Sequence, residues 1–145
     1  MKTDKFRFKV KFNDCLGNVK LCKVTELRFN KYGVSYIFYM DGKDKNMVSS
    51  VREDVVLLMY SNFYDKNKVR ICEGDIIKKD GAGLVAVKFN AGNGFVVYDP
   101  ECCTECKNGE GCLENLDYFI LGDPRHIEII GNIFKNYDLL TGGKK

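Results

Sequence analysis

The residues best suited to chemistry in this 145-residue sequence are four cysteines crowded between positions 102 and 112, in CCTECKNGEGC. Cys103 and Cys106 have the C-x-x-C spacing of a zinc knuckle, in which two thiolates bind one ion from a tight turn. Two glycines farther along the loop would let the chain fold back, so that Cys112 becomes a third ligand. Cys102 directly precedes Cys103, and two adjacent cysteines rarely bind one ion together. The loop therefore offers three good ligands, Cys103, Cys106 and Cys112.

A structural zinc site is tetrahedral, so a fourth ligand would have to come from elsewhere in the fold. The candidates are Cys22, Cys72 and His126. The alternatives to zinc are a disulfide formed on isolation, such as Cys103 with Cys112, and reduced thiols in an exposed loop. The cysteines number seven, an odd count, and a cytosolic location keeps thiols reduced. We expect reduced thiols and no cofactor, with zinc as the alternative.

His126 is the only histidine of the sequence, which limits acid–base catalysis and the activation of a cysteine nucleophile. It follows Asp123-Pro124-Arg125, a turn-like stretch in which a histidine is usually solvated. The sequence contains no P-loop, no GxSxG nucleophile elbow and no HExxH zinc motif. We therefore expect no enzyme activity. A metal-dependent enzyme that uses the cysteine loop and His126 is the weakest alternative.

A second candidate site is a basic strand near the N-terminus, in KFRFKVKF at residues 5–12. Apolar and cationic residues alternate there, which places four cations on one face of a strand, about 6.6 Å apart. These cations are Lys5, Arg7, Lys9 and Lys11. One interpretation is a solvated face that protects a sheet edge from mispairing. The other is a binding surface for nucleic-acid phosphate or for an acidic protein. Three tyrosines would add base stacking if exposed, or would belong to the core: Tyr32, Tyr36 and Tyr39.

The period of two recurs along the whole chain and predicts strands rather than helices. The expected strands are 5–12, 19–29, 34–40, 75–79, 84–89, 95–98, 118–121 and 127–134. Residues 47–59 are ambiguous, and we favour a strand over a short helix. Residues 41–46 are expected to form a turn, 61–75 a polar link, and 135–140 one helical turn.

These elements predict an all-β protein with two parts. Residues 1–64 would form an N-terminal β-meander, and the short strands of residues 65–140 a small barrel or sandwich. Residues 141–145, TGGKK, read as a flexible tail. Small β modules with exposed strand edges often pair with copies of themselves. We therefore expect a homo-oligomer.

Two motifs in the C-terminal half resemble a known family. Asp65-Lys66-Asn67 leads into Glu73-Gly74-Asp75-Ile76, and the chain closes with Glu128-Ile129-Ile130-Gly131-Asn132-Ile133-Phe134, Asn136 and Leu139-Leu140. This pattern, a DKNG-like turn, EGD-I and then E-x-IGNIY-x-N-x-x-LL, is similar to the YopX family of phage and prophage proteins over about residues 65–140. Lys68 stands where the family usually has glycine, and the cysteine loop is an insertion. Residues 1–64 carry no such resemblance.

The resemblance implies a phage source and a C-terminal SH3-like small β-barrel over residues 65–140, without an activity. Composition implies a folded domain, since 45% of the residues are hydrophobic and 12% aromatic. The sequence contains no stretch of about 18 apolar residues and no signal-peptide core, so we expect the cytoplasm of a bacterial host and no membrane. The net charge of +3 decides little between partners.

We expect a phage-encoded, non-catalytic binding protein that inhibits a host antiviral defence component, such as a CRISPR effector, by occupying its surface. Its partner would be a host protein or ribonucleoprotein. The alternative is a nucleic-acid or nucleotide-binding accessory protein of phage replication.

Overall fold

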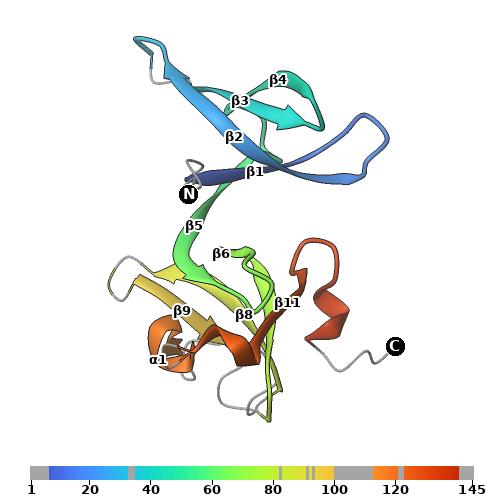
Figure 1. Ribbon diagram of the computed structural model, residues 1–145. Coiled ribbons are helices and arrows are strands. Elements are labelled where there is room, and N and C mark those ends of the chain that lie inside the picture. Colours follow the sequence, from blue (N-terminus) through green and yellow to red (C-terminus); the bar gives the residue numbers. More distant parts are fainter. Residues whose placement is uncertain are drawn as a thin grey trace. The chain divides into compact units, whose positions relative to one another are not determined.

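The computed structural model describes residues 7–32, 35–81, 83–90, 92, 94–99, 113–120 and 123–140. It is an all-β structure with two antiparallel sheets (Figure 1). The chain divides into two compact units, which are Met1–Tyr60, the N-terminal unit, and Ser61–Lys145, the C-terminal unit. In the described part of the chain, no helix has the length and apolarity needed to cross a bilayer.

The first sheet has six strands in the order β4-β3-β2-β1-β5-β6. Their bounds are β1 Phe8–Asn13, β2 Val19–Phe29, β3 Ser35–Asp41, β4 Asp44–Ser49, β5 Val56–Tyr64 and β6 Arg70–Cys72. The first four are joined by successive hairpins, and β5 returns to pair with β1. The basic strand is therefore inside the sheet, and the interpretation that it protects a sheet edge is wrong.

The N-terminal unit buries one side of its hairpins. The alternation in β1 places Val10 and Phe12 in the core, and the register pairs Val10 with Cys22 on the same side. Ile37 is 1% exposed and Tyr39 lies 5.0 Å from Phe12, ring centroid to centroid. Tyr39 is thus a core residue rather than a stacking surface.

The second sheet has five strands in the order β10-β9-β8-β7-β11. Their bounds are β7 Asp75–Lys79, β8 Gly83–Asn90, β9 Gly94–Tyr98, β10 Glu114–Asn115 and β11 Ile127–Asn132. The core of the C-terminal unit includes Ile77, Val87, Val97 and Ile127. Neither sheet closes on itself within the described residues, so the expected SH3-like barrel is not confirmed.

Several expectations about individual elements were wrong. Residues 118–121 do not form a strand, because α1, Leu116–Ile120, covers most of them. Its buried residues are Leu116, Phe119 and Ile120, which have the i, i+3, i+4 spacing of one helix face. The expected turn at 41–46 is shorter, since β4 begins at Asp44, and the expected link at 61–75 contains the end of β5 and all of β6. The described part of the chain also has two 3₁₀ turns, Pro124–His126 and Tyr137–Leu139.

Two hairpin turns, one in each unit, share a single geometry. At Asp14 the carboxylate oxygen Oδ1 accepts the amides of Leu16 and Asn18, and the Asp14 carbonyl accepts the amide of Gly17. The same turn begins at Asp65, where Oδ1 accepts two amides and the carbonyl accepts the amide of Lys68. The fourth residue of each turn has a positive φ, 84° at Gly17 and 64° at Lys68.

Lys68 therefore occupies a left-handed conformation that costs a residue with a Cβ about 1–2 kcal/mol. We predict that Lys68→Gly raises the free energy of unfolding by about 0.5–1 kcal/mol, after the loss of entropy of a glycine is subtracted. In the converse change, Gly17→Ala, the added Cβ would meet no atom within 4 Å. The change should lower the free energy of unfolding by about 1 kcal/mol, because alanine is strained at this positive φ. Urea denaturation followed by circular dichroism measures both, and a Lys68→Gly variant less stable than the parent would contradict the assignment.

Candidate binding surface

The cysteine loop cannot be placed, because Cys102, Cys103, Cys106 and Cys112 lie outside the described residues. The structure describes three cysteines, Cys15, Cys22 and Cys72, of which Cys15 is exposed. Cys22 and Cys72 are buried and belong to different units. Over the described ranges, no group of three His, Cys, Asp or Glu side chains could hold a metal ion.

His126 lies in an exposed cluster of ion pairs at the start of β11. Its Nδ1 is 3.2 Å from Oδ2 of Asp80, and its Nε2 is 3.6 Å from Oδ2 of Asp123. Hydrogen bonds from the side chain and backbone of Arg125 lower the pKa of Asp123 to about 2. Each ring nitrogen of His126 therefore lies near a carboxylate. This arrangement is typical of a surface residue that stabilises the turns around it.

The structure describes three of the four cations of the basic strand, since Lys5 lies outside the described residues. Arg7 is exposed, whereas Lys9 and Lys11 are half-buried. Lys9 is directly opposite Lys23 in the register, and its Nζ lies 5.6 Å from the ring centroid of Tyr60. The role of the basic strand and its binding partner remain predictions.

The recurrent motifs of the C-terminal half meet at a buried carboxylate. Asp65 is 3% exposed, and its Oδ1 accepts the amides of Asn67 and Val69 at 2.9 Å each. Its other oxygen, Oδ2, accepts the amide of Ile129 in β11 at 3.0 Å. A backbone hydrogen bond from Lys66 to the Ile127 carbonyl lies beside it. The first motif is thus tied to the last one.

The second motif, around Gly74, contacts the last one as well. Gly74 has a φ of 92°, and its carbonyl accepts the amide of Ile133 at 2.8 Å. A Cβ at Gly74 would lie 2.9 Å from Cε2 of Phe134, so the aromatic ring packs directly on this glycine. Asp75 caps the same turn, because its Oδ2 accepts the amide of Cys72 at 2.7 Å.

The last motif forms a corner that only particular residues fit. The register of β11 shifts between Ile129 and Gly131, and a Cβ at Gly131 would lie 2.6 Å from Oδ1 of Asn136. That oxygen accepts the amide of Asn132, whose own Oδ1 accepts the amide of Phe134 at 3.0 Å. The motif residues therefore build the fold of the C-terminal unit rather than a reactive site.

A different surface, in the N-terminal unit, has side chains that the fold does not use. Alternation in β2, β3 and β4 sends one set of side chains to the core and the other set to the opposite side. We call this second set the outer face, which comprises Glu26, Arg28, Tyr36, Phe38, Met40, Lys45 and Met47. All seven are exposed or half-exposed. Figure 1 shows β2, β3 and β4 side by side.

Phe38 is at the centre of the outer face. Cross-strand pairing places it between Glu26 and Met47. The guanidinium carbon of Arg28 lies 5.3 Å from its ring centroid, and the Nζ of Lys45 lies 5.4 Å from it. The Arg28 side chain also donates to the Glu26 carboxylate, which lowers the pKa of Glu26. Glu26 thus stays ionised and holds both cations beside one aromatic ring.

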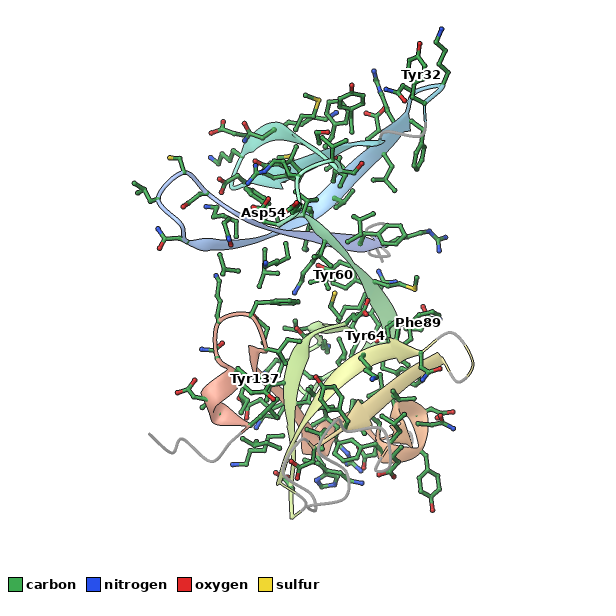
Figure 2. All side chains as sticks on the ribbon, turned by 180° about the vertical axis from the view of Figure 1, so that it is seen from behind. Tyr32, Asp54, Tyr60, Tyr64, Phe89 and Tyr137 are labelled. Carbon is green, nitrogen blue, oxygen red and sulfur yellow. The ribbon has the colours of Figure 1, made fainter. Side chains whose placement is uncertain are left out.

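The hairpin that joins β2 to β3 presents two further aromatic side chains to solvent. Phe29 is 70% exposed and Tyr32 is 78% exposed. We call Phe29, Asn30, Lys31 and Tyr32 the hairpin tip, and Figure 2 shows Tyr32 at its end. Of the tyrosines that the sequence suggested for stacking, Tyr32 and Tyr36 are accessible. The outer face was missed, although Tyr36, Phe38 and Met40 alternate with buried Ile37 and Tyr39 and could have been recognised.

Comparison with known proteins identifies relatives of the whole chain. The family model described as YopX protein matches residues 5–141. The match therefore also extends over most of the N-terminal half, where the residues alone suggested no resemblance. The crystal structure of protein yopX from Bacillus subtilis is similar, with a TM-score of 0.55 and 16% sequence identity, covering 92% of this chain and 96% of that one. This likeness concerns the fold. Curated protein sequences give no match.

We predict that Asp65→Ala lowers the free energy of unfolding by about 3–5 kcal/mol, because it strands backbone amides that a buried carboxylate accepts. The matched control is Asp14→Ala, which removes the same kind of carboxylate from the same kind of turn. There, water can replace the acceptor, because Asp14 is only half-buried, and the loss should be much smaller. Urea denaturation of both variants tests this, and similar losses would contradict a special role for Asp65.

Proposed function

Because the chain belongs to the YopX family, we propose that this phage-associated protein is a non-catalytic binding protein that inhibits a host antiviral defence component. It would act by occupying the surface of that component, such as a CRISPR effector, in the cytoplasm of the bacterial host. The observation that carries the proposal is the outer face, on which aromatic, methionine and arginine side chains remain accessible on a regular sheet.

The composition of the outer face favours a protein partner. Tyrosine, phenylalanine, methionine and arginine are enriched in the cores of protein interfaces, whereas lysine, glutamate and aspartate are depleted. Hot spots are rich in tyrosine and arginine and lie near the centre of the contact. Arg28 is already held by Glu26 and by the ring of Phe38. Less side-chain entropy is therefore lost when Arg28 enters an interface.

The chemistry of the outer face supports binding rather than catalysis. Its one carboxylate, Glu26, is engaged by Arg28 and by Lys45, whose Nζ is 3.7 Å from Oε1. A general base would instead need an accessible carboxylate of raised pKa. Oligomerisation is supported by β4, which stands at the end of the strand order and so leaves one backbone edge for a second copy. Reduced thiols in the cysteine loop, with zinc as the alternative, remain part of the proposal.

We predict that Met47→Glu abolishes inhibition of the host defence while the protein stays folded. Met47 is 52% exposed, so a charge there costs the fold little, whereas it would be buried against the partner. The matched control is Val69→Glu, at a residue that is 51% exposed in the C-terminal unit. The assay measures phage survival in cells with an active CRISPR system that express each variant.

Capture of the partner from nuclease-treated host lysate provides the second readout. We expect the parent and Val69→Glu to capture one host defence protein. Met47→Glu and Phe38→Ala should capture at least about tenfold less of that protein. Replacement of Lys5, Arg7, Lys9 and Lys11 by glutamate tests the basic strand in the same assay. If Met47→Glu and Phe38→Ala inhibit and bind as the parent does, the outer face is not the working surface.

A further inference from the structure

We propose that the hairpin tip, Phe29 to Tyr32, is a binding site for single-stranded nucleic acid, in which unpaired bases stack on the two aromatic rings. This activity is separate from protein binding by the outer face and does not depend on it. A ribonucleoprotein partner would engage both surfaces, one through its protein and the other through its RNA or DNA.

The first support is the exposure of the tip. Phe29 ends β2 and is paired with Ser35, yet its side chain is 70% exposed. Tyr32 is 78% exposed, and Figure 2 shows it at the far end of the hairpin. Burial of either ring would contribute about 1.5–3 kcal/mol to folding, so the fold gains little from aromatic residues here. Two large rings in solvent within four residues therefore suggest a ligand for them.

The second support is charge. The tip itself, FNKY at residues 29–32, contains two aromatic residues and one cation but no acidic residue. The Nζ of Lys31 lies 5.2 Å from the ring centroid of Tyr32, so one cation accompanies the most exposed ring. A ligand that is anionic and has flat apolar faces complements this combination. Single-stranded nucleic acid has both properties, since each base is followed by a phosphate.

The third support is the local geometry of the turn. Oδ1 of Asn30 accepts the amide of Tyr32 at 2.9 Å, which fixes the backbone between the two residues. Lys31 and Tyr32 are consequently held on a defined turn rather than on a free chain end. A fixed backbone reduces the entropy that is lost when a base stacks on the ring of Tyr32.

These observations favour nucleic acid over a protein pocket at the tip. A pocket that accepted the ring of Tyr32 would also desolvate the ammonium group of Lys31, which is costly without a paired anion. A nucleic acid instead supplies a phosphate beside each base, in solvent. Double-stranded nucleic acid is disfavoured, because its bases are already stacked on one another and offer no free face.

The test is fluorescence anisotropy with the full chain and labelled dT20, rU20 and a 20-base-pair duplex. We expect dissociation constants of about 10⁻⁶–10⁻⁴ M for the single strands at physiological salt, and weaker binding of the duplex. A difference between dT20 and rU20 shows which of the two polymers the protein prefers. Tyr32→Ala should weaken binding by about 5- to 150-fold, since one stacked base is lost.

Lys31 and Tyr32 should differ in how their removal changes the salt dependence of binding. Lys31→Ala should reduce the slope of log affinity against log salt by about 0.7, because one phosphate contact is lost. Tyr32→Ala should leave that slope unchanged. The matched controls are Tyr118→Ala, a tyrosine 67% exposed on α1, and Lys43→Ala, an exposed lysine in another turn. Both should bind as the parent does.

The proposal is overturned if the single strands do not bind, if the tip variants bind as the controls do, or if the duplex binds more tightly. It is also overturned if Tyr32→Ala loses only the protein captured from nuclease-treated lysate, since the tip would then contact protein. Loss of capture by Met47→Glu with normal dT20 binding would leave both proposals standing. Normal capture by Met47→Glu contradicts only the outer face.

Discussion

The carboxylate of Asp65 is the interaction on which the C-terminal unit depends. A buried charge is stable only when its oxygens are hydrogen-bonded, and this one accepts three backbone amides from two segments 60 or more residues apart. Two of these bonds close the turn that follows β5, and the third attaches the turn to β11 at its register shift. The unit is thereby closed by a polar contact, which has directional requirements that apolar packing lacks.

The other motif residues act on the same region by close approach rather than by charge. Gly74 and Gly131 both lie where a Cβ would collide with a neighbour. At Gly74 the neighbour is the ring of Phe134, and at Gly131 it is the side-chain amide of Asn136. Each glycine thus leaves room for the side chain that packs on it. Asn132 stabilises the turn after β11, because its Oδ1 accepts the amide of Phe134. The DKN, EGD and GNIF segments of this chain depend on one another in this geometry, because each part fits only if the others are present. Such a pattern indicates how the chain folds and does not identify a ligand.

Sequence reasoning succeeded where a strand alternates and one face is buried. β2 begins where the alternation predicts, because burial on one side forces a period of two. β7 and β11 also begin where predicted, although Ile76 and Ile77 of β7 are both buried and pack into different clusters. The prediction of a strand failed at α1, because YFIL has the composition of a strand. Only tertiary packing beside β9 and β10 selects a helix there. Closure of a barrel is likewise a property of strand number and stagger that no single segment encodes. The left-handed conformation of Lys68 was hidden for a related reason, because a turn held by Asp65 imposes it on an unfavourable residue.

The candidate surfaces could be predicted only in part because exposed residues leave weak signals. The basic strand has a strong pattern but lies within the sheet, and the register that shows this depends on β5, almost 50 residues away. The outer face has a weaker pattern, since both faces of β3 carry large side chains and burial alone tells Phe38 from Tyr39. Residues that the core does not require can be changed with little effect on stability. The proposed binding residues of the N-terminal unit can therefore be changed without disturbing the closing network of the C-terminal unit.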